Sequence, residues 1–164
     1  MHIENRIDKI SHYIGKTVAW FTTILVLVVV YDVFTRYFLL ESSVALQEMT
    51  WHIFSIIFLL GASYTLKEDA HVRVDIFYQK FSDKSKAVIN SIGVILFVIP
   101  FCVVLIISST NWTINSYMIN EVSPDQGGLP FRFLIKAVLP LSFVLVLLQS
   151  LALLVSSIKI IVRK

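Results

Sequence analysis

The stretch AVLPLSFVLVLLQSLALLVSSI, residues 137–158, carries no charged side chain and lies between Lys136 and Lys159. A helix needs roughly 17–25 predominantly apolar residues to cross a bilayer. Only helices and closed barrels satisfy every backbone group in lipid, and this run lacks the alternating pattern of barrel strands. The stretch therefore predicts a transmembrane helix over residues 137–158.

Three further runs have the same character, and together the four runs dominate the composition. Hydrophobic residues make up 57% of the sequence, and the mean hydropathy is +0.80. Charged residues make up 15%, whereas a soluble domain carries roughly 25%. We therefore predict one all-α integral membrane domain over residues 1–164, with four transmembrane helices at about residues 17–37, 49–66, 87–110 and 137–158.

The third run is longer than one crossing requires, because it stays uncharged from residue 87 until Glu121. Its last part is rich in hydroxyl and amide side chains. We expect the helix either to continue past the bilayer or to bend at Pro100, since a proline inside a helix removes one hydrogen bond and commonly kinks the helix. Pro140 is expected to act similarly near the start of the fourth helix.

Lysine and arginine are distributed unevenly among the segments that flank the runs. They gather in the N-terminal segment, between the second and third runs, and after the fourth run: Arg6, Lys9, Lys16, Lys67, Arg73, Lys80, Lys84, Lys86, Lys159, Arg163 and Lys164. Because basic flanks stay inside, we predict that both termini are cytoplasmic. No small-residue cleavage site follows the first run, so we expect an uncleaved first helix. Because the basic residues are divided among these three segments, they do not form a single basic surface. We therefore do not expect nucleic-acid binding.

Charged residues at the ends of the first two runs have two interpretations each. Asp32 and Arg36 are four apart, share a helix face and are expected to pair. The pair is either an ion pair near the outer membrane surface or part of a proton or ion relay. Glu48 precedes the second run, where a carboxylate complements the helix dipole. It is also a candidate for contact with another protein.

The connection KEDAHVRVDIFYQKF, residues 67–81, combines an apolar face with a charged cluster. Val72, Ile76 and Phe77 can share one helical face, which predicts a short amphipathic helix in the membrane interface at about residues 72–81. The charged cluster is either a structural connector with paired charges or a docking site for a partner. Its members are Asp69, His71, Arg73 and Asp75.

The connection EVSPDQGGLP, residues 121–130, is rich in turn-forming residues. Glu121 and Pro124 are candidates for contact with a partner protein. The pair Gly127–Gly128 lacks the strand, helix and lysine of a phosphate-binding loop, which argues against nucleotide binding. The sequence also shows no Ser/His/Asp or Cys/His nucleophile set with a supporting motif. We therefore expect no enzyme activity, no cofactor and no metal.

Small residues and one histidine complete the membrane pattern. Gly61-Ala62-Ser63 and Gly93 are expected to allow close helix packing. His52 is the only histidine near the membrane core, so a second axial haem ligand is not available. A haem-bearing or other membrane-anchor subunit of a redox complex is the alternative function. A self-sufficient small exporter would need a carboxylate deep within a helix, and the central parts of the runs have none.

The order of these features resembles the small membrane subunit, DctQ-type, of tripartite ATP-independent periplasmic (TRAP) transporters. The resemblance rests on Gln47-Glu48, on Leu60-Gly61-Ala62-Ser63-Tyr64, and above all on DAHVRVD at residues 69–75. The proline-containing outer connection and Leu147-Leu148-Gln149 extend it. It covers nearly the whole chain, from about residue 17 to residue 158.

The resemblance implies a fold and a role that the residue patterns do not supply. It implies a multi-pass protein of the bacterial inner membrane, surrounded by lipid, that associates with a large polytopic subunit carrying the substrate and sodium sites. A periplasmic binding protein would deliver an organic acid for symport with an ion gradient. This subunit would then serve as a scaffold and help to dock the binding protein. The substrate cannot be named, because the family's substrate sites lie on other subunits.

Overall fold

The structure is a computed structural model that describes residues 2–68, 78 and 80–162. The described residues form helices, turns and irregular connections, with no strand among them. In chain order the helical elements are α1 His2–Phe34, the π-helical segment η1 Thr35–Leu39, α2 Val44–Lys67, α4 Asp83–Gly93, the π-helical segment η2 Val94–Val98, α5 Ile99–Met118 and α6 Phe133–Val162.

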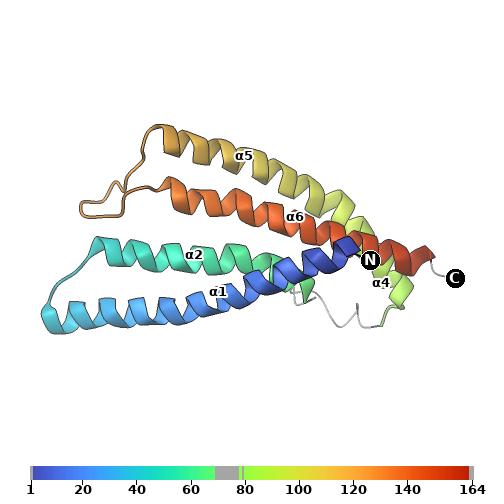
Figure 1. The fold of residues 1–164 in the computed structure, drawn as a ribbon, viewed down its shortest axis with the longest axis horizontal. Helices are drawn as coiled ribbons and strands as arrows, with labels where there is room; N and C mark the ends of the chain where they lie inside the picture. The colour runs from blue at the N-terminus through green and yellow to red at the C-terminus, as the bar shows by residue number, and fades with distance from the viewer. Residues whose placement is uncertain (1, 69–77, 79, 163–164) are drawn as a thin grey trace.

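Four helical stretches in the described part are long and apolar enough to cross a membrane, as predicted. They are Asn5–Leu39, Val44–Lys67, Asp83–Met118 and Phe133–Val162. Helices α1 and α2 lie side by side, as do α5 and α6, and α6 also contacts α1, α2 and α4 (Figure 1). Helix α6 is therefore the central element of the bundle.

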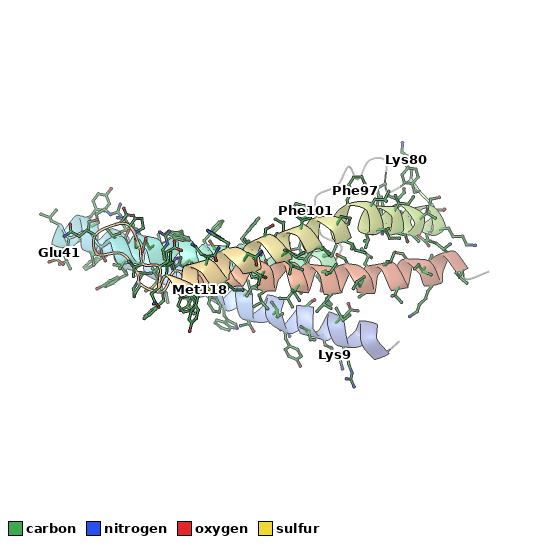
Figure 2. The ribbon with its side chains drawn as sticks, turned by 90° about the horizontal axis from the view of Figure 1, so that it is seen from above. Lys9, Glu41, Lys80, Phe97, Phe101 and Met118 are labelled. Carbon is green, nitrogen blue, oxygen red and sulfur yellow. The ribbon has the colours of Figure 1, made fainter. Side chains whose placement is uncertain are left out.

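The two ends of the bundle differ in what they contain (Figure 1). We call the terminus end the one that holds the start of α1, the end of α6 and α4. We call the loop end the one that holds the connections 40–43 and 119–132. Lys9 and Lys80 lie toward the terminus end and Glu41 toward the loop end (Figure 2). The segments rich in lysine and arginine therefore lie at one end of the bundle, and the connections with few basic residues lie at the other.

Helix α1 starts well before the predicted transmembrane run. It is helical from His2, whereas the apolar run begins at residue 17. Ser11 is only 2% exposed, while Lys9 and Lys16 are exposed. The N-terminal segment is thus an amphipathic helix. Because its inner face is polar, a search for apolar runs does not detect it. At its other end the helix passes through η1 and stops at Leu40, which adopts φ 56°.

Helix α2 starts at Val44, before the predicted residue 49, because Ser43 caps it. The Ser43 hydroxyl accepts a hydrogen bond from the Leu46 backbone N–H at 3.4 Å. Glu48 therefore lies within the helix rather than ahead of it. The helix ends at Lys67, close to the predicted residue 66.

The third span runs without a break from Asp83 to Met118, 36 residues in all. Ser82 caps its start by accepting from the Ser85 N–H at 3.3 Å. Pro100 lies in the first turn of α5, directly after the π-helical segment η2. Widening of the helix before a residue that lacks an N–H accommodates the lost hydrogen bond. The helix is therefore continuous through Pro100 and extends to Met118, beyond the predicted residue 110.

The predicted interfacial helix at residues 72–81 falls mostly outside the described residues. Of the described residues in this range, Tyr78 is helical, Lys80 is in a turn and Phe81 is in a bend, so the interfacial helix stays a prediction. The chain becomes helical again at Asp83. The described residues 80–82 are thus not helical and lead directly into α4.

Close helix packing occurs at Gly15 rather than at Gly93. A Cβ atom added to Gly15 would lie 2.5 Å from Cδ2 of Tyr64, whereas one added to Gly93 would meet nothing within 4 Å. The expectation for Gly93 was wrong, because that side of the helix faces away from the bundle. A Cβ at Gly61 would meet Val18 at an ordinary 4.0 Å. Ser63, beside it, is fully buried.

Helix α6 packs through small polar side chains that satisfy their own hydrogen bonds. Ser142 donates to the Leu139 carbonyl at 2.8 Å, and Ser150 donates to the Val146 carbonyl at 2.7 Å. Both are buried, at 2% and 0% exposure. Such back-bonded serines let neighbouring backbones approach without an unpaired hydroxyl in the membrane.

Candidate functional site

Two clusters of polar contacts join segments that are far apart in the sequence. The loop-end cluster comprises Glu48, Glu121, Ser123, Leu129 and Lys136. The terminus-end cluster comprises Asp8, Ser11 and Gln149. Each contains buried groups whose partners lie on another element, so each fixes how the elements are assembled.

Glu48 is the centre of the loop-end cluster. Ser123 donates its hydroxyl to Oε1 of Glu48 at 2.6 Å, and the backbone N–H of Leu129 donates to Oε2 at 2.5 Å. The residue is only 6% exposed. Hydrogen bonds to a carboxylate are shorter and stronger than those between neutral groups. The structure thus places this predicted partner-interface residue in contact with the chain's own outer connection.

The two glycines in that connection are each required for a different structural reason. Gly127 adopts φ 81°, which a side chain would strain. A Cβ added to Gly128 would lie 2.8 Å from Oε2 of Glu48 and 2.5 Å from Cβ of Ser123. The first glycine makes the turn and the second lets the backbone close over Glu48. Pro124 lies on the same connection and is exposed.

Glu121 forms an ion pair with Lys136 at the start of α6. The Lys136 side chain is 9% exposed, and its Nζ lies 4.2 Å from the ring centroid of Trp112. The nearby ammonium group of Lys136 lowers the pKa of the Glu121 carboxyl below its usual range. The pair therefore ties the outer connection to α5 and α6, as Glu48 ties it to α2.

A groove lies beside this ion pair, with a volume of about 370 Å³. Trp51, Trp112, Arg132 and Lys136 contribute to its lining. The Arg132 guanidinium lies 5.9 Å from the Trp51 ring centroid, within cation–π range. Among the described residues, no group of three or more His, Cys, Asp or Glu side chains could hold a metal ion.

Gln149 joins α1 to α6 at the terminus-end cluster. Ser11 donates its hydroxyl to Oε1 of Gln149 at 2.7 Å, and Nε2 of Gln149 donates to Oδ1 of Asp8 at 3.0 Å. Gln149 is 4% exposed. Asp8 and Ser11 were not predicted as site residues. The available signal was the lone amide within the uncharged run 137–158, which requires a partner when it is buried.

Tyr64 packs next to this cluster, between α1 and α2. Its ring covers Gly15, lies 6.1 Å from the His12 ring centroid, and has Lys67 Nζ 5.6 Å from its own centroid. Lys67 also donates to Glu68 at 2.7 Å. Two short motifs of the chain, at residues 60–64 and 147–149, thus lie at the same end of the bundle.

The remaining predicted site residues fall into two groups. Asp32 and Arg36 form the expected i,i+4 ion pair, in which the Asp32 side chain is 11% exposed and that of Arg36 is 46% exposed. The cluster of Asp69, His71, Arg73 and Asp75 lies outside the described residues. Its connector and docking interpretations therefore both remain predictions.

One comparison with known proteins gives a match. A family model described as "Tripartite ATP-independent periplasmic transporters, DctQ component" matches residues 25–160. No curated protein and no solved structure matches the chain. The matched range includes Glu48, Tyr64, Glu121 and Gln149, and it leaves out Asp8 and Ser11. Most of the chain and the whole loop-end cluster therefore fall within the match, whereas Gln149 is the one member of the terminus-end cluster that does.

Proposed function

Because the chain belongs to the DctQ family, the small membrane component of TRAP transporters, we propose that it is the scaffold on which a large membrane subunit imports an organic acid. In this proposal the large subunit carries the substrate and the coupling ion, which we take to be sodium. The present chain holds the stationary part of the complex in the membrane. A periplasmic binding protein delivers the substrate.

The observation that supports a scaffold is that polar contacts between elements hold both ends of the bundle. Glu48 and Lys136 hold the outer connection to α2 and α6, and Gln149 holds α1 to α6. A scaffold has to resist the force of a moving partner, and buried charge-assisted contacts at both ends suit that task. These polar contacts are satisfied within the chain, so they are not offered to a transported solute.

We place the terminus end in the cytoplasm, on the strength of its lysine and arginine residues. The loop end then faces the periplasm, where the binding protein docks. Pro124 and Asp125 are exposed on the outer connection and are available for that contact. Glu48 and Glu121 act on docking indirectly, by holding the connection in shape.

Reconstitution into liposomes tests the proposal. With a sodium gradient and organic acids, the chain alone should give no uptake, and the large subunit with the chain and the binding protein should give uptake. The matched control replaces this chain with empty lipid while keeping the other two components. Uptake by the chain alone would overturn the scaffold role, as would full uptake in its absence.

A further inference from the structure

A hollow of about 760 Å³ lies at the terminus end, apart from both polar clusters. One wall is a face of α4 that includes Lys86, Ala87 and Asn90, and the other is a face of α6 that includes Leu153 and Ser157. Figures 1 and 2 show α4 beside the last turns of α6. Nothing in the scaffold role requires a space of this size between two packed helices.

The walls of the hollow are both polar and apolar. Ala87 and Ser157 are buried, at 2% and 3% exposure, and their short side chains leave the space open. Leu153 adds apolar surface, while Ser156 and Ser157 add hydroxyl groups. An occupant must therefore carry polar and apolar parts together.

The charge at the mouth of the hollow is positive overall. Lys84 and Lys86 line it together with one acidic residue, Asp83. Lys86 Nζ lies 5.6 Å from the Tyr78 ring centroid, and the Tyr78 hydroxyl donates to Asn90 at 3.2 Å. The two lysines also lie in the first turn of α4, where the helix dipole adds positive potential.

An apolar strip lies farther along the same span, on the side of the helix opposite to the face of Ala87 and Asn90. Ile92, Ile95 and Leu96 are 50%, 51% and 62% exposed. In a helix that crosses the membrane, this strip is in contact with lipid acyl chains. The hollow therefore lies at the end of a span that is surrounded by lipid.

We propose that this hollow binds one anionic phospholipid, such as phosphatidylglycerol. Its phosphate lies against Lys84, Lys86 and the serines of α6, and its acyl chains leave the hollow past Leu153. The site goes beyond the scaffold role and does not depend on transport. It requires only that α4 and α6 belong to membrane-spanning helices.

Native mass spectrometry of the full-length chain tests the site. The protein is mixed with equal amounts of phosphatidylglycerol and phosphatidylcholine that carry the same acyl chains. The wild type should retain phosphatidylglycerol preferentially. The Lys84→Gln/Lys86→Gln variant should lose about 25-fold in that preference, because each lysine near an anionic headgroup contributes roughly fivefold.

Two further variants separate the hollow from general surface charge. Lys9→Gln/Lys16→Gln removes the same charge from exposed positions of α1 and should keep the preference. Ser156→Phe fills the hollow without a change of charge and should reduce retention of both lipids. An unchanged preference in the Lys84/Lys86 variant overturns the proposal, as does an equal loss in the Lys9/Lys16 variant. Displacement of the lipid by excess inorganic phosphate would identify a soluble-anion site instead and would overturn it too.

Discussion

Ser11 and Gln149 are 138 positions apart in the sequence, and their side chains are joined by a hydrogen bond of 2.7 Å. Both residues are buried, at 2% and 4% exposure, and the same amide reaches Asp8. One side chain on the central helix thus fixes the position of the N-terminal helix.

Gln149→Leu should destabilise the folded chain by about 1–3 kcal/mol, because it leaves Ser11 and Asp8 without their buried partner. Thermal unfolding in detergent measures the loss. Gln47→Leu is the matched control, since Gln47 is exposed and its side-chain amide donates to the exposed Ser42 at 3.3 Å. That change should stay within about 0.5 kcal/mol. Equal effects of the two substitutions would contradict the bridging role of Gln149.

The Glu121–Lys136 ion pair should make stability depend on acidity at the loop end. The Lys136 ammonium lowers the pKa of Glu121 in the folded chain. A lowered folded pKa means that the stabilisation is complete above the ordinary value of 4.5 and is lost as the pH falls through the lowered value. Melting curves recorded from neutral to acidic pH measure this.

Glu121→Gln should remove that part of the acid sensitivity and lower stability at neutral pH. Glu41→Gln is the control, because Glu41 is exposed at the same end of the bundle. If Glu121→Gln melts with the same pH profile as the wild type, the ion pair does not contribute to stability.

Gly15→Ala should destabilise the bundle by about 1–3 kcal/mol, because the added methyl group overlaps the Tyr64 ring. Gly93→Ala is the same substitution in another helix and meets nothing within 4 Å. It should stabilise the helix by roughly 0.5–1 kcal/mol. We expect the melting temperature to fall for Gly15→Ala and to rise for Gly93→Ala. A change in the same direction for both would contradict the close packing of Gly15 against Tyr64.

Glu48→Ala should release the connection 119–132 from α2, because Ser123 and the Leu129 N–H lose their shared acceptor. Loss of charge-assisted bonds worth roughly 1.5–3 kcal/mol should raise local opening by about 10-fold or more. Limited proteolysis of the connection measures the opening. Glu41→Ala removes an exposed carboxylate and should leave the cleavage rate unchanged; faster cleavage in both variants would argue against a specific Glu48 contact.

Arg73→Ala should lower both co-purification with the large subunit and uptake, if the charged cluster at residues 69–75 docks that partner. Removing one member of a partly buried ion pair costs about 3–5 kcal/mol, against roughly 0–1 kcal/mol for a solvated pair. Lys9→Ala is the control, since Lys9 is exposed on α1. Wild-type complex yield and uptake with Arg73→Ala would leave the cluster as a water-facing connector.

The sequence was enough to predict the helices, but much of the candidate site was beyond it. Apolar runs indicate spans because the bilayer excludes charge, and Asp32 pairs with Arg36 because the spacing is local. Glu48 was predicted to contact a partner protein. Its hydrogen-bond partners in the structure, Ser123 and Leu129, are 75 and 81 positions away in the same chain. No local pattern reports a contact over such a distance. The wrong expectation for Gly93 has the same cause, since a small residue does not reveal which side of a helix faces a neighbour.

The span Asp83–Met118 has a consequence for the membrane itself. Its 36 residues make a rod of about 54 Å at 1.5 Å per residue, whereas the hydrocarbon layer is about 30 Å thick. Such a helix must lean steeply, extend into both headgroup layers or thicken the lipid beside it. Where it thickens the lipid, a protein that packs against this helix lies in a bilayer whose local thickness differs from that of the surrounding membrane.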